Sequence, residues 1–223
     1  MPSVVGQLTG GQGPEQLSAG LHILLILTLM ALAPAILVTT TSFTRILIVL
    51  AFTRQAMGTP NIPPNMVLIP LAGFLTLLSM GPVLDQVYAD ALKPGLEGKL
   101  QPIQAYERAA APLRSFMQRN TRQKDLAMLL QAARLPRPQN LQEVPDRVLV
   151  PAFVLSELRA AFTMGFALFL AFMAVDLVVS GILMALGMFM VPPMSISLPI
   201  KLLLFVLVDG WSLITRSLLF SFS

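Results

Sequence analysis

The sequence predicts an all-α integral membrane protein, built from about four long apolar helices and one charged helical insertion. Three observations predict this class. Of the 223 residues, 55% are hydrophobic and only 12% are charged, about half the charge content of a typical soluble domain. The charges are also unevenly placed, since 19 of the 26 lie between Asp85 and Arg159. Long uncharged runs fill the rest of the chain, and a hydrocarbon core of about 30 Å needs only about 20 helical residues.

Composition also excludes several other classes. The chain has no cysteine and one histidine, so thiol catalysis, a disulfide framework and a transition-metal site are not expected. The net charge of +4 comes without a basic run that would follow a phosphate backbone, so we expect no nucleic-acid partner. No phosphate-binding glycine loop or nucleophile motif occurs. We therefore expect neither an enzyme nor a cofactor.

The first 84 residues predict a polar tail followed by an apolar hairpin. Residues 1–20 lack the cationic and apolar regions of a signal peptide, and we expect that one has been removed before them. Twenty-nine uncharged residues separate Glu15 from Arg45, and thirty separate Arg54 from Asp85. The hairpin, residues 21–84, is expected to contain helices at 21–41, 42–58 and 65–84, with the proline-rich stretch before residue 65 as its breaker.

Residues 85–159 form the charged segment, which is expected to be helical and extracytoplasmic. Its apolar residues repeat at helical spacing, as in Leu126, Leu129, Leu130 and Ala133. Arg45 and Arg54 flank the first connection with no acid between them, and Lys201 follows the second. Excess positive charge favours the cytoplasmic side for both short connections, which places the charged segment on the opposite side.

Residues 160–223 predict a second apolar hairpin with a methionine-rich turn. One helix is expected at about 151–190 and the next at about 199–219, with Pro192 and Pro193 between them. Met184, Met188, Met190 and Met194 fall within eleven residues. Methionine side chains adapt to different shapes, so this turn either forms a yielding seal or packs as an ordinary helix end.

Four charges lie inside these apolar helices, where ionisable groups are expensive and usually have a function. Asp176 has no cation near it in its own helix, whereas Lys201, Asp209 and Arg216 are spaced by about two helical turns and are expected to share one face. One interpretation is a proton or ion relay. The other is pairing between helices that fixes their assembly, for example between Asp176 and Lys201 or Arg216.

Six motifs give the sequence a specific resemblance. They are SFTRILIVL (42–50), GTPNIPPN (58–65), PLRSFM with TRQKDL (112–126), VPAFVLSELRAAFTMGF (150–166), LMALGMFMVPP (183–193) and KLLLFVLVDGW (201–211). In this order they resemble the FliP family of flagellar type III export-gate proteins, whose relatives in virulence systems are called SctR. The resemblance runs from about Leu21 to the C-terminus.

The resemblance implies a function and a set of partners. Members form a pentameric core that joins FliQ and FliR in a protein-conducting pore, works with FlhA and FlhB, exports unfolded flagellar subunits and is needed for flagellum assembly. It implies a place in the bacterial inner membrane, within the flagellar basal body and in contact with lipid, with much of the assembly on the periplasmic side. Met188, Phe189 and Met190 correspond to the gasket that constricts the pore.

Two other functions remain open at the level of the sequence. An ion- or proton-conducting transporter would use Asp176 and Asp209 as its carriers. A scaffold for assembly would use the apolar helices without lining a pore.

Overall fold

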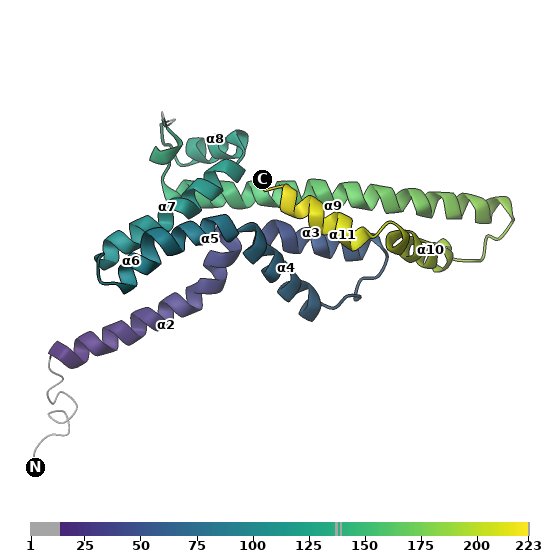
Figure 1. The fold of residues 1–223 in the computed structure, drawn as a ribbon. Coiled ribbons are helices and arrows are strands. Elements are labelled where there is room, and N and C mark those ends of the chain that lie inside the picture. Colours follow the sequence, from purple (N-terminus) through teal and green to yellow (C-terminus); the bar gives the residue numbers. More distant parts are fainter. Residues whose placement is uncertain (1–13, 137, 139, 223) are drawn as a thin grey trace, which may run out of the picture. The chain divides into compact units, whose positions relative to one another are not determined.

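The computed structural model describes residues 14–136, 138 and 140–222, and every element in that part of the chain is a helix (Figure 1), which confirms the predicted all-α class. The chain divides into two compact units, Met1–Leu37 and Val38–Ser223. The described part of the first unit belongs to α2 (Pro14–Thr40), an apolar helix that contains Pro34. The expected polar tail is therefore helical from Pro14 onward, and its first thirteen residues lie outside the described part.

The second unit contains the other elements. Most of its long helices are apolar, and most of its short helices lie within the charged segment. In chain order they are α3 (Phe43–Ala56), α4 (Asn65–Ser79), α5 (Gly81–Val87), the π-helix η1 (Tyr88–Leu92), α6 (Lys93–Leu96), α7 (Pro102–Asn120), α8 (Gln123–Ala132), the 3₁₀-helix η2 (Leu141–Glu143), α9 (Asp146–Ala185), α10 (Pro193–Leu207) and α11 (Gly210–Phe220).

Helix α9 contributes to two hydrophobic cores. In the first core α3 packs against α9 and α4, and α10 and α11 contribute further buried residues. Ile46, Leu50 and Leu68 are almost fully buried there. The α3–α9 contact is close, because a Cβ added to Gly165 would lie 2.6 Å from the ring of Phe52. Small residues at such contacts let two helical backbones approach one another.

The second core covers the first turns of α9 and comes from the charged segment. Helices α5, α7 and α8 bury residues that include Val83, Phe116 and Leu126 against Leu149 and Phe153 of α9. The periodic apolar residues of this segment therefore face inward, as amphipathic helices require. Arg114, a cation of the charged segment, pairs with Asp146 and donates to the carbonyl oxygens of Gln142 and Val144.

Two of the expected long helices are broken, which corrects the sequence prediction. Residues 65–84 divide into α4 and α5, bent by 64° at Met80, because Pro82 has no N–H to continue the helical ladder. Residues 199–219 divide into α10 and α11, bent by 63°. The second break contains no proline. It occurs next to Gly210, whose backbone lies directly against the ring of Phe205.

Hydropathy and length test which helices can cross a membrane. In the described part of the chain α9 alone is long and apolar enough to cross one by itself. The number rises to four if each of three pairs of successive helices counts as one span, namely the end of α2 with α3, α4 with α5 to α6, and α10 with α11. This is compatible with the predicted membrane protein of about four apolar segments.

Candidate functional site

The methionine-rich turn between α9 and α10 is held at both ends by its own backbone. Gly187 adopts a left-handed conformation with φ of 72°. The N–H of Met188 donates to Leu183 O at 2.9 Å, and the N–H of Gly187 donates to Met184 O at 3.0 Å. This pair of hydrogen bonds is the Schellman motif, in which a glycine ends a helix without steric cost. Pro192 and Pro193 then start α10, since proline is favoured at a helix N-terminus.

The side chains of this turn point away from the cores of the chain. Met188, Phe189 and Met190 are 42%, 80% and 96% exposed. Met184 at the end of α9 and Met194 at the start of α10 are exposed as well. Three consecutive large apolar side chains in water would be unfavourable, so their position favours a contact that the isolated chain does not supply.

Asp176 and Lys201 form an ion pair between α9 and α10. The Nζ atom of Lys201 donates to Asp176 Oδ2 at 2.6 Å. The Lys201 side chain is 8% exposed, whereas that of Asp176 is 37% exposed. The second carboxylate oxygen of Asp176 is nevertheless buried. The two charges therefore join the arms of the second hairpin.

Asp209 and Arg216 lie apart from that pair, so the expectation that Lys201, Asp209 and Arg216 share one face is wrong. Asp209 is an exposed residue at the break between α10 and α11, where its φ is 51°. The helix axis changes direction there, so the eight-residue spacing no longer aligns Lys201 with it. Arg216 is exposed on α11, with its guanidinium 5.6 Å from the ring centre of Phe220.

The structure also contains a buried ion pair that the sequence analysis missed. Arg45 Nε donates to Glu157 Oε2 at 2.8 Å, and a second contact joins Arg45 Nη2 to Glu157 Oε1. Arg45 is 5% exposed and Glu157 is 0% exposed. Arg45 Nη1 also donates to the carbonyl and hydroxyl oxygens of Ser221, both at 3.0 Å, and the guanidinium lies 4.0 Å from the ring centre of Phe222.

This pair corrects two predictions from the sequence. The positive charge of Arg45, which predicts the orientation of the first connection, is balanced inside the protein by Glu157. Glu157 belongs by sequence to the charged extracytoplasmic segment, but it is fully buried. One signal could have found the pair, because Arg45 is the single charge in SFTRILIVL and Glu157 is the single acid in VPAFVLSELRAAFTMGF, where Arg159 is the other charge.

The described residues offer no site for metal-dependent chemistry, because none of their histidine and carboxylate groups cluster as metal ligands would. What the chain presents instead is apolar surface on the second half of α9 and on α10. The exposed large residues of these helices include Phe162, Phe166, Leu170, Met173, Leu177, Ile182, Leu203, Val206 and Leu207. Such a surface is typical of a contact with lipid or with another protein.

These features define a class: an all-helical membrane protein with an exposed methionine-rich turn and more apolar surface than its own cores cover. Comparison with known proteins identifies the family within this class. The model of the FliP family matches residues 26–218. The flagellar biosynthetic protein FliP of Bacillus subtilis (strain 168) is 48% identical over 209 residues, which are 94% of this chain and 95% of that protein.

Relatives from other bacteria agree with this match. FliP of Pectobacterium carotovorum is 49% identical over 227 residues, with 99% of this chain and 88% of that protein covered. FliP of Borreliella burgdorferi is 43% identical over 213 residues, with 94% and 84% covered. The chain belongs to the FliP family, which confirms the resemblance found in its six motifs.

Proposed function

We propose that the chain is a subunit of the flagellar type III protein export gate, where it forms the core of a protein-conducting pore with FliQ and FliR. The observation that carries this proposal is the exposed turn Met188–Met190. Membership of the FliP family supports it, and the relatives reported above are named as flagellar biosynthetic proteins. The export of unfolded flagellar subunits for flagellum assembly is the activity proposed for this gate.

The turn has the chemistry that a pore gasket needs. A seal must close the pore when it is empty, and it must also fit around an extended polypeptide whose side chains vary in size. Methionine has three rotatable bonds and a polarizable sulfur, so Met188 and Met190 can repack around different shapes. Phe189 adds a rigid ring between them. A ring of five copies would place fifteen such side chains around one axis, held by the cap at Gly187 and by the following prolines.

The remaining apolar surface supports assembly in a membrane. The exposed faces of α4, α9 and α10 provide room for other copies, for FliQ and FliR, and for lipid. FlhA and FlhB are the further partners proposed in the export apparatus. The proposed location is the bacterial inner membrane at the flagellar basal body, with much of the assembly on the periplasmic side.

Ion conductance through the assembled gate tests the gasket. Replacing Met188 and Met190 together by alanine removes most of the sealing volume, so we expect higher leakage of small ions with unchanged assembly. The matched control replaces Met184 and Met194, which are 58% and 68% exposed but belong to the flanking helices. Unchanged conductance in an assembled Met188/Met190 variant would refute the gasket role.

The alternative, a proton or ion transporter that uses Asp176 and Asp209, has no observation in its favour among the described residues. Asp176 already has a cationic partner in Lys201, and Asp209 is exposed at a helix break. The alternative predicts proton flux through the purified chain in liposomes that Asp176→Asn abolishes.

A further inference from the structure

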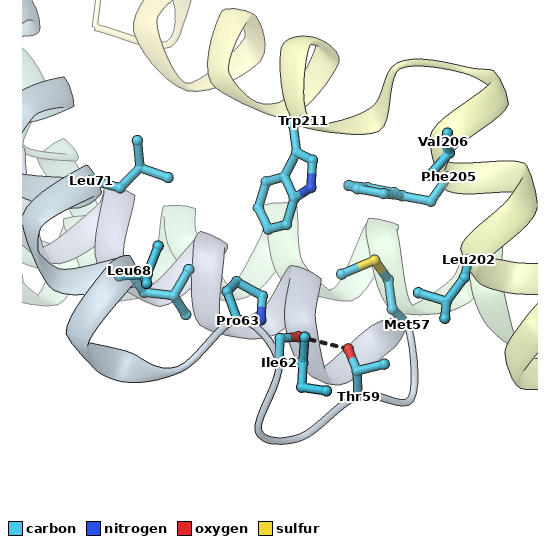
Figure 2. Close-up of a pocket in the computed structure, with 11 residues that line it drawn as sticks. Met57, Thr59, Ile62, Pro63, Leu68, Leu71, Leu202, Phe205, Val206 and Trp211 are labelled. Atoms are coloured by element: carbon cyan, nitrogen blue, oxygen red, sulfur yellow. Dashed lines mark hydrogen bonds between the residues drawn. The ribbon is translucent and has the colours of Figure 1, made fainter.

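An apolar cavity of about 480 Å³ lies among the loop after α3, α4, α10 and α11. Figure 2 shows the side chains that surround it, with Trp211 directed from α11 toward the loop and α4, and Phe205 and Leu202 contributed by α10. The one hydroxyl group in its wall, on Thr59, already donates to Ile62 O at 2.9 Å. Its walls are otherwise almost entirely hydrocarbon, so the cavity suits an apolar occupant.

Local packing at the α10–α11 break fixes the tryptophan that lines this cavity. A Cβ on Gly210 would clash with the ring of Phe205, so only glycine allows this approach. The next residue, Trp211, then packs edge-on against the same ring, with centroids 5.3 Å apart. The break in the helix therefore positions a large aromatic side chain at the cavity.

A cation without a counter-ion is bonded to the wall of the same cavity. Arg54 Nη1 donates to the carbonyl oxygen of Pro63 at 3.1 Å and to Asn65 Oδ1 at 2.8 Å. The Nε atom of Arg54 is buried and has no hydrogen-bond partner among the residues that the structure describes. No acidic residue occurs between Glu15 and Asp85, and no carboxylate in the described part of the chain pairs with Arg54.

We propose that this site binds an anionic phospholipid, with one acyl chain in the cavity and the phosphate paired with Arg54. Charge complementarity selects this occupant, since a phospholipid carries an anion and a hydrocarbon chain in one molecule. A phosphate oxygen would accept from the other terminal nitrogen of Arg54, Nη2, which bonds to no acceptor among the described residues, and charged hydrogen bonds of this kind are strong. The site rests on the cavity and on Arg54 alone, and it does not depend on the proposed export role.

Fluorescence of Trp211 tests the proposal directly, because it is the only tryptophan in the chain. The full-length chain is reconstituted in phosphatidylcholine nanodiscs that contain a minor fraction of lipid with brominated acyl chains, which quench tryptophan on contact. Brominated phosphatidylglycerol is compared with brominated phosphatidylcholine. We expect the anionic lipid to be preferred about fivefold, the size of the attraction of one arginine to anionic lipid.

Two variants test the arginine and the cavity separately, and a third variant serves as a control. Arg54→Gln is expected to abolish the preference for phosphatidylglycerol while quenching by either lipid persists. Leu202→Phe fills the cavity and is expected to reduce quenching by both lipids. Arg216→Gln removes an exposed arginine from the helix that carries Trp211, and it should leave the preference unchanged, which controls for net charge. Circular dichroism reports whether each variant keeps its helices.

Two results would overturn the proposal. Equal quenching by the two lipids in the unchanged chain means that Arg54 selects no anion. Absence of quenching by either lipid means that protein, such as a second copy of the chain, covers the cavity. If Arg54→Gln loses its helical signal, Leu202→Phe and the comparison of lipids in the unchanged chain still decide between these outcomes.

Discussion

The buried pair of Arg45 and Glu157 gives the sharpest test of what holds the chain together. Arg45→Met keeps most of the side-chain volume but leaves the Glu157 carboxylate inside the protein without its cation. The pair links α3 to α9, and Arg45 also binds the last described turn of the chain through two hydrogen bonds to Ser221. We therefore expect this single substitution to destabilise the packing of three helices.

The size of the effect follows from the burial of both groups. Removing one partner of a buried ion pair typically costs about 3–5 kcal/mol, because the other charge is left uncompensated. Replacing both partners by apolar residues of similar volume is often neutral. The double variant Arg45→Met with Glu157→Leu should therefore regain most of the stability that Arg45→Met loses. Asp146→Asn, in a pair whose aspartate side chain is 54% exposed, should cost no more than about 1 kcal/mol.

Unfolding in detergent, followed by circular dichroism, measures these differences. For a chain of this size a loss of 3–5 kcal/mol corresponds to a fall in melting temperature on the order of 10 °C. A loss for Arg45→Met as small as that for Asp146→Asn would refute the argument from burial. A double variant as unstable as Arg45→Met would show that the side chains stabilise the protein by their shape and not by their charge balance.

Two further substitutions test the helix break and the second ion pair by the same unfolding measurement. Gly210→Ala should cost about 1–3 kcal/mol through overpacking against Phe205, whereas Gly181→Ala, where a Cβ would meet no atom within 4 Å, should be neutral or stabilise by up to about 1 kcal/mol. Equal effects of the two would contradict the close contact. Asp176→Asn should cost about 1–3 kcal/mol because Lys201 loses its anion, and exchanging the two residues should restore part of that loss. An exchange that restores nothing would argue against the pair.

The sequence predicted those features that depend on local hydrophobicity. Uncharged runs and helical spacing indicated the all-α membrane class, and the Pro192–Pro193 pair correctly indicated a break between two apolar helices. The helix α9 nevertheless ends at Ala185, five residues before the predicted end at 190, because Gly187 terminates it. These predictions succeed because proline, glycine and the spacing of apolar residues act over a few neighbouring positions. The family itself was identified from six short motifs, since each combines residues that hydrophobicity alone does not specify.

Features that depend on contacts between distant residues were not predicted. Arg45 and Glu157 are 112 positions apart, so their pairing follows from how α3 lies on α9 and not from either local sequence. The break at Asp209 has a different origin, because it depends on residues that are close in sequence. The stretch LFVLVDGWSL is apolar enough to be predicted as continuous helix, but the ring of Phe205 lies against Gly210 where a side chain would otherwise be.

The Asp176–Lys201 pair constrains what covers the exposed half of α9. A helix with only hydrocarbon side chains could face lipid on all sides, but a helix that carries an aspartate paired with a lysine cannot do so cheaply. Around it α9 exposes Met173, Leu177 and Val178, which lipid and protein accept equally well. We infer that the side of α9 that carries Asp176 faces protein or a water-filled interior, and that lipid contacts are confined to its other sides. We therefore expect the apolar composition of the chain to serve assembly with other subunits as much as insertion in the membrane.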